Sequence, residues 1–134
     1  MKILGIEHVA VAVADLEEPA RVFHQLLGLK DGGSEEVPDQ QVITHIFDTG
    51  RGKVELLQAT GTGSPVSRFI AKKGPGIHHI AFLVDDLKAW LRHLEQQGVE
   101  LIDRVPRRGA GGYLIAFLHP RSTAGILVEL CQKP

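Results

Sequence analysis

The stretch IEHVAVAVADL at residues 6–16 recurs as IHHIAFLVDDL at residues 77–87, a constant offset of 71 positions. Six of the eleven positions are identical. A second pair, VELLQ at 54–58 and VELCQ at 128–132, shares four of five residues at an offset of 74. Two matches in the same order in each half indicate an internal repeat. We therefore predict a single domain, 1–134, built from two copies of one module.

The modules are predicted to span about 6–58 and 77–132, with a connector at about 59–76 that is rich in glycine, serine and proline. Each begins with a β-branched strand and continues into a helix that an aspartate, Asp15 or Asp86, caps and that Gly28 or Gly98 ends. A short helix is predicted at about 67–73. The predicted strands are 6–13, 29–37, 42–48 and 53–58 in the first module, and 77–84, 99–105, 114–119 and 126–131 in the second. The order βαβββ, repeated twice, predicts an α+β fold.

Composition narrows the function classes. The 134 residues are 43% hydrophobic and carry 15 basic and 16 acidic side chains, a net charge of −1, which argues against a broad nucleic-acid surface. No apolar run approaches the roughly 20 residues of a membrane span. The single cysteine, Cys131, excludes an internal disulfide framework, and the start of the sequence has no apolar secretory segment. We expect a cytoplasmic protein that binds neither nucleic acid nor membrane.

The repeat also duplicates polar residues. His8 and His79 occupy equivalent positions in the first strand of each module, and Glu55 and Glu129 occupy equivalent positions in the last. A lone histidine in a strand is usually hydrogen-bonded to backbone, and a lone glutamate usually faces water. The joint pattern indicates instead a cleft in which two imidazoles and two carboxylates hold a divalent metal ion. Four protein ligands around an octahedral ion leave two positions for substrate oxygens.

The whole chain resembles the vicinal oxygen chelate superfamily, which includes glyoxalase I, and within it the methylmalonyl-CoA epimerases. The most specific match is GAGGYLIAFLHPRSTAGILVEL at residues 109–130. The resemblance implies a glyoxalase-like fold whose metal ligands are His8, Glu55, His79 and Glu129. His78 then lies on the opposite face of its strand and is expected to pack or to support a ligand.

The activity implied by the resemblance is epimerisation at C2 of methylmalonyl-CoA, through a metal-stabilised enolate, in a homodimer. Cobalt(II) is the preferred ion, and Mn²⁺, Ni²⁺ and Zn²⁺ are alternatives. Some epimerases place a second catalytic glutamate where this chain has Thr44, which cannot accept a proton at neutral pH. Glu129 and Glu55 are therefore the predicted catalytic carboxylates, on opposite faces of the substrate. A metal-bound or free water is the alternative to Glu55.

The acyl-CoA substrate needs a phosphate-binding region outside the metal cleft. Candidates are Arg107, Gly111 and Gly112 in a basic glycine-rich segment, and Arg121 and Ser122 in the turn after Pro120. Glycines let backbone N–H groups approach an anion, and arginine pairs with phosphate. A solvated hairpin is the alternative interpretation of such a segment.

Other activities use the same fold. Glyoxalase I would need the same four ligands, and the 109–130 stretch argues against it. An extradiol dioxygenase would use two histidines and one glutamate with Fe(II), in a longer chain. A non-catalytic member of the superfamily would bind a small ligand without metal, and a structural dimer would carry vestigial ligands.

Overall fold

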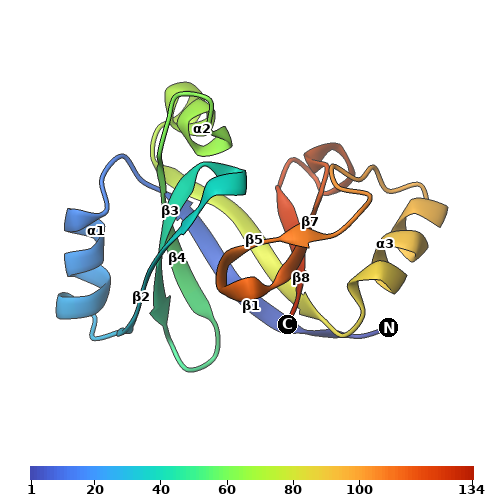
Figure 1. The fold of residues 1–134 in the computed structure, drawn as a ribbon, viewed down its shortest axis with the longest axis horizontal. Helices are drawn as coiled ribbons and strands as arrows, with labels where there is room; N and C mark the ends of the chain where they lie inside the picture. The colour runs from blue at the N-terminus through green and yellow to red at the C-terminus, as the bar shows by residue number, and fades with distance from the viewer. The chain divides into compact units, whose positions relative to one another are not determined.

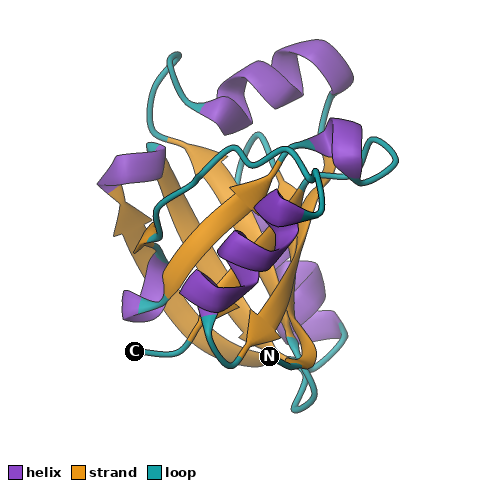
Figure 2. Cartoon of the chain, turned by 90° about the vertical axis from the view of Figure 1, so that its right-hand side faces the viewer, coloured by secondary structure: helices purple, strands orange, loops and turns teal.

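The computed structural model describes residues 1–134, which divide into two compact units. The first unit is His8–His78, and the second comprises Met1–Glu7 and His79–Pro134. Helices and strands follow one another along the chain in the order predicted from the repeat (Figures 1 and 2). The elements are β1 (Ile3–Ala12), α1 (Glu17–Ala20), β2 (Lys30–Val37), β3 (Val42–Asp48), β4 (Lys53–Ala59), α2 (Pro65–Lys73), β5 (Gly76–Val84), α3 (Leu87–Gln96), β6 (Arg107–Arg108), β7 (Leu114–Leu118) and β8 (Val128–Gln132).

The strands of the first unit lie in the order β2-β3-β4-β1. The β2–β3 and β3–β4 pairs are antiparallel hairpin neighbours, whereas β1 runs parallel to β4. The strands of the second unit repeat this arrangement as β6-β7-β8-β5, again with two antiparallel pairs and one parallel pair, β5–β8. The α+β class and the two βαβββ modules predicted from the sequence are confirmed.

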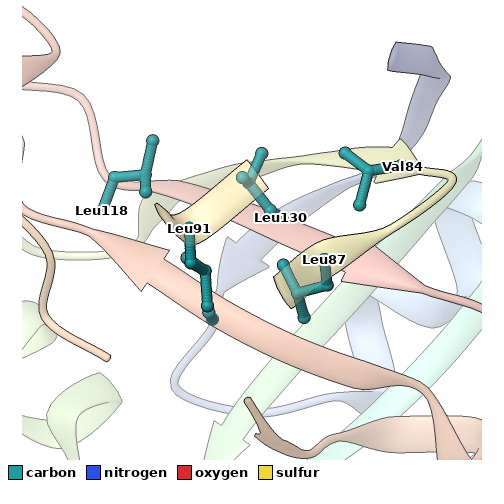
Figure 3. Close-up of a cluster of buried hydrophobic side chains, with 6 residues drawn as sticks. Val84, Leu87, Leu91, Leu118 and Leu130 are labelled. Carbon is teal, nitrogen blue, oxygen red and sulfur yellow. The ribbon is translucent and has the colours of Figure 1, made fainter. Parts of the chain in front are cut away.

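In each unit, a helix covers one face of the strands. In the second unit, Leu87 and Leu91 of α3 pack against Val84, Leu118 and Leu130, and the labelled side chains lie together in Figure 3. In the first unit, Val13, Phe47 and Leu56 form the corresponding cluster, with Leu16 and Phe23 of the helical segment packed against it. Side chains alternate faces along a strand, so the remaining residues of the same strands point to the face that these helices do not cover.

In each unit, a glutamine side chain accepts a hydrogen bond from the start of the helix. The Leu16 backbone N–H donates to Gln58 Oε1 at 3.0 Å, and the Leu87 N–H donates to Gln132 Oε1 at 2.7 Å. Each donor is one of the N–H groups that a helix start leaves without an internal partner. The identical final residue of VELLQ and VELCQ therefore connects the last strand of each module to its helix.

The first helix differs from the prediction at its start and in its second half. Asp15 does not act as its N-cap: the cap position is Leu16, and the Asp15 carboxylate accepts the N–H of Glu17, only two residues ahead. Asp86 does cap α3, by accepting the Ala89 N–H at 3.0 Å. Beyond Ala20 the first helix continues as a π-helix over Arg21–Leu26. Gly28 and Gly98, which were predicted to end the two helices, have left-handed φ angles of 75° and 84°.

The predicted strand at 99–105 is wrong. Leu101 makes only an isolated bridge to Leu118, and the strand that pairs with β7 is the two-residue β6. The Asp103 carboxylate accepts the Phe117 N–H at 2.9 Å, so a side chain takes a place that a backbone carbonyl would take in a ladder. Pro106 has no N–H to donate and restricts the residue before it.

The connector helix begins earlier than predicted, at Pro65, because Ser64 caps it by accepting the Val66 N–H at 3.2 Å. A proline in the first turn removes an N–H that has no partner there. None of the helices combines the length and apolar character needed to cross a bilayer.

Candidate metal centre

The first unit holds a buried imidazole–carboxylate pair. His8 lies on β1 and Glu55 on β4, where Glu55 pairs in register with Ala10. His8 is two residues from Ala10, so both polar side chains point to the same face. His8 Nδ1 lies 2.6 Å from Glu55 Oε2, and each residue is 6% exposed.

The second unit holds the equivalent pair. His79 lies on β5 and Glu129 on β8, where Glu129 pairs in register with Ala81. His79 Nε2 lies 2.9 Å from Glu129 Oε2, and both residues are 4% exposed. Each glutamate thus stands beside an alanine, Ala10 or Ala81, whose small side chain leaves room for the imidazole two residues away. The interpretation that these were solvated glutamates does not hold, because both carboxylates are buried.

Both pairs lie on the face that the helix of their unit does not cover. Glu55 alternates with Leu56, which belongs to the helix-facing cluster of the first unit, and Glu129 alternates with Leu130, which belongs to that of the second. The helices therefore stabilise one face of each set of strands through apolar packing, and the opposite face is left to carry polar chemistry.

The donor set fits a divalent ion. An ion with metal–ligand distances of about 2.1 Å holds neighbouring ligands of an octahedron about 3.0 Å apart. The two nitrogen–oxygen separations, 2.6 and 2.9 Å, are close to that spacing. Burying a carboxylate is costly unless a charge or hydrogen-bond partner compensates it, and a cation beside each pair would provide further compensation. Neutral imidazole with carboxylate is a set that Zn²⁺, Co²⁺, Ni²⁺ and Mn²⁺ accept.

An aromatic side chain that the sequence pattern does not single out, Phe117, packs against His79 and is itself covered by a cationic group. The Phe117 ring meets the His79 ring edge-on, with centroids 5.2 Å apart at an interplanar angle of 90°. The Arg107 guanidinium lies over the Phe117 ring, 5.7 Å from its centroid. Phe117 pairs in register with Glu129, so they share a face, but only the β7–β8 register reveals this.

The predicted phosphate-binding arginines, Arg107 and Arg121, each form an ion pair with a different acidic residue. Arg107 Nε lies 3.1 Å from Asp103 Oδ1, an ion pair whose angles are outside those of a hydrogen bond. Arg121 Nε lies 3.4 Å from Glu100 Oε2, and Ser122 Oγ accepts the Glu100 N–H at 2.9 Å. Arg121 and Ser122 thus both bind Glu100, which lies in the segment after α3.

Gly111 and Gly112 have φ angles of 66° and 75° within a 3-10 turn, a left-handed conformation that glycine adopts without strain.

The structure also places Thr44 and His78, two residues named in the sequence analysis. Thr44 on β3 is 2% exposed and pairs with Leu57, two residues from Glu55, so it shares the face of the first-unit pair. The His78 ring packs edge-on against Phe69, with centroids 5.1 Å apart, in agreement with the packing role predicted for it.

Comparisons with known proteins agree with this fold. Residues 7–117 match the Glyoxalase/Bleomycin resistance protein/Dioxygenase superfamily. The uncharacterised protein YqjC of Bacillus subtilis is 43% identical over 127 residues, which cover 95% of this chain and 91% of YqjC. An ethylmalonyl-CoA/methylmalonyl-CoA epimerase of Cereibacter sphaeroides is 38% identical over 129 residues, 95% of this chain and 96% of the relative.

A solved structure is also similar. A Streptomyces coelicolor methylmalonyl-CoA epimerase variant, in complex with 2-nitronate-propionyl-CoA, superimposes with a TM-score of 0.93 at 31% identity. The match covers 98% of this chain and 96% of that one. The family model matches most of this chain, and each unit contains one βαβββ module. The chain therefore belongs to the glyoxalase/bleomycin resistance protein/dioxygenase superfamily and has the vicinal oxygen chelate fold of that superfamily.

Proposed function

We propose that this chain is a metal-dependent epimerase that inverts C2 of methylmalonyl-CoA. The observation that carries the proposal is the duplicated buried pair, His8 with Glu55 and His79 with Glu129, each on the helix-free face of its unit. The similarity to epimerases named for methylmalonyl-CoA, one of them solved with an acyl-CoA, supports the choice of substrate.

The proposed ligands of one divalent ion are His8, Glu55, His79 and Glu129, with Co²⁺ preferred and Mn²⁺, Ni²⁺ or Zn²⁺ as alternatives. Such an ion would act as a Lewis acid toward the thioester and carboxylate oxygens that flank C2. His79 orients the Glu129 carboxylate through their contact, and His8 does the same for Glu55.

Epimerisation requires that a proton leave C2 on one face and that another arrive on the opposite face. Glu129 is the proposed proton acceptor on one face, because it is a buried carboxylate held by an imidazole. A positioned base contributes about 10²–10⁴-fold to such a step. Glu129→Gln is therefore expected to abolish inversion. Glu55 is the proposed proton carrier on the other face, with a metal-bound or free water as the alternative.

The CoA moiety carries phosphates, and Arg107 with the glycine turn Gly111–Gly112 is the proposed binding region. Arg107 is a charged group already held in place by Asp103, and the left-handed glycines let backbone N–H groups reach an anion. Arg121 and Ser122 remain proposed contacts of lower priority, because both engage Glu100. Homodimerisation and a cytoplasmic location stay predictions.

The test is proton NMR of methylmalonyl-CoA in D₂O with metal-loaded protein and with a chelator-stripped control. Loss of the C2 proton signal together with inversion, both dependent on metal, is the expected result. Absence of exchange with Co²⁺, Mn²⁺, Ni²⁺ and Zn²⁺ alike would overturn the proposal. The same preparations would then be assayed with the glutathione hemithioacetal that glyoxalase I converts.

A further inference from the structure

Asp103, in the segment after α3, binds the backbone of Phe117 on both sides of that residue. Its carboxylate accepts the Phe117 N–H at 2.9 Å, and the backbone N–H groups of Ile102 and Asp103 donate to the Phe117 carbonyl at 2.9 and 3.2 Å. Both backbone groups of Phe117 are therefore directed away from β8. Opposed residues of an antiparallel pair that exchange no backbone hydrogen bonds have Cα atoms only about 4.5 Å apart. The Phe117 side chain is consequently held close to that of its register partner, Glu129.

The same carboxylate also holds the cation that covers the Phe117 ring. Asp103 Oδ1 lies 3.1 Å from Arg107 Nε, and the Arg107 guanidinium lies 5.7 Å from the centroid of the Phe117 ring. The Asp103 side chain is 15% exposed, so water and salt screen this ion pair less than they would a surface pair. The backbone and the ring of Phe117 thus both depend on contacts of Asp103.

Phe117 transmits this restraint to His79. The two rings meet edge-on with centroids 5.2 Å apart, and His79 Nε2 lies 2.9 Å from Glu129 Oε2. Groups that surround a metal-binding imidazole fix the orientation of its ring, and their loss typically costs about 10–100-fold in metal affinity or activity. Every contact from Asp103 to Glu129 lies within the second unit.

The first unit is built without this arrangement. The residue in register with Glu55 is Ile46, which has no aromatic ring. Its strand, β3, pairs along the eight-residue β2, whereas β7 pairs with the two-residue β6. The first module therefore forms the same order of strands without a carboxylate in the place of a strand. The contacts of Asp103 are an addition to the shared fold, and they accompany only the His79–Glu129 pair.

We propose that Asp103 is a positioning residue of the metal centre, which fixes Phe117 and through that ring orients the His79 imidazole beside Glu129. Asp103 itself touches neither ion nor substrate. The inference rests on the proposed function only in taking His79 as a metal ligand. A residue that merely stabilised the fold would leave the surroundings of the His79 ring unchanged in a folded variant.

Three substitutions separate these roles. Asp103→Asn keeps an oxygen that can accept the Phe117 N–H but removes the charge that holds Arg107, and Phe117→Leu removes the ring while keeping an apolar side chain. Glu95→Gln is the matched control, because Glu95 also pairs with an arginine, Arg104, whose Nε lies 3.5 Å from its Oε1. Glu95 belongs to α3, which packs on the other face of the strands. Circular dichroism of each variant should match that of the unmodified protein.

Proton–carbon NMR of the histidine rings, on metal-free protein at one fixed pH, reports the surroundings of His79 directly. The ring current of Phe117 shifts the His79 signals, which are assigned by their absence in His79→Gln. Asp103→Asn should move these signals in the same direction as Phe117→Leu. The double variant should move them no further than Phe117→Leu alone, and Glu95→Gln should leave them in place.

Calorimetric titration with Co²⁺ provides a second readout. Asp103→Asn and Phe117→Leu should each weaken Co²⁺ binding by about 10-fold. Because both act through one ring, the double variant should also lose about 10-fold, whereas independent effects would multiply to about 100-fold. Glu95→Gln should bind Co²⁺ as the unmodified protein does.

Two results would overturn the assignment: unchanged His79 signals in folded Asp103→Asn, or losses of Co²⁺ affinity that multiply in the double variant. If Asp103→Asn does not fold, Arg107→Gln replaces it under the same two criteria, because it removes the cation and leaves the Asp103–Phe117 hydrogen bond in place. Metal-loaded protein that shows the expected His79 and Co²⁺ responses but exchanges no C2 proton of methylmalonyl-CoA would refute the epimerase proposal and support the role of Asp103.

Discussion

If one ion is shared by the two imidazole–carboxylate pairs, removing the charge of either carboxylate should weaken metal binding. The change is Glu55→Gln in the first unit or Glu129→Gln in the second, each of which keeps an oxygen that can accept from the neighbouring imidazole but removes the negative charge. If both pairs hold one ion, either substitution should weaken the same binding event. If each pair held its own ion, the unmodified protein would take up two ions and each variant would retain one.

The magnitude follows from linkage between binding and folding. An ion present at 100 times its dissociation constant stabilises the folded chain by about 2.7 kcal/mol. Unfolding 134 residues has an entropy of about 0.28 kcal/mol/K near the transition, so the metal-bound protein should melt about 10 °C higher. A loss of about 100-fold in affinity, the upper range for a perturbed metal site, would leave about 0.4 kcal/mol and a shift of about 1.5 °C.

Calorimetric titration would give the number of ions per chain and the dissociation constant, and thermal melts with and without Co²⁺ would give the shift. Each variant is compared with its own metal-free form, so that a change in stability of the apo protein does not enter. Glu36→Gln, with an equal loss of charge, should keep the full shift. An unchanged shift in Glu55→Gln, or a stoichiometry of two ions per chain, would refute the shared site.

Three further predictions concern the scaffold. Leu87→Ala should lower the free energy of unfolding by about 2–5 kcal/mol in urea denaturation, because Leu87 is 0% exposed in the α3 cluster. Leu26→Ala, at a 62% exposed position, should cost about 0.5 kcal/mol or less, and equal losses in the two variants would contradict the packing of Leu87. Gln132→Ala should cost about 1 kcal/mol, because the Leu87 N–H loses its acceptor, and Gln132→Glu, which keeps an acceptor, should cost less in the same assay. His45 and the Gly33 N–H hold the pKa of Asp31 below its ordinary value, so their contribution is present above about pH 4 and is lost as the pH falls. Asp31→Asn should therefore flatten the acid side of a stability–pH curve, and an unchanged curve would show that this interaction contributes nothing.

Local patterns predicted much of the fold because they depend on the geometry of the backbone. Alternation within Ile6–Val13 and Ile77–Val84 indicates strands whatever they pair with. The repeat then places His8 with His79, and Glu55 with Glu129, at equivalent points without any knowledge of the structure. The burial of all four residues agrees with that placement.

The segment from 99 to 105 shows where local patterns fail. Its apolar residues are typical of a strand, but the Asp103 carboxylate occupies the Phe117 N–H, and a ladder cannot continue through that position. Whether a side chain replaces a backbone partner depends on which strand comes within reach, and that is a property of the folded chain.

By itself, the sequence determined the repeat, the order of helices and strands, and the four candidate ligands, since residue type and spacing along one chain carry that information. The tertiary structure decided which residues of different strands share a face. Phe117 beside Glu129, and Glu35 beside Thr44, follow from strand register alone. A shift of one residue would send each of these side chains to the opposite face, and register is set by packing against the helices and by the turns, which no single stretch of sequence encodes.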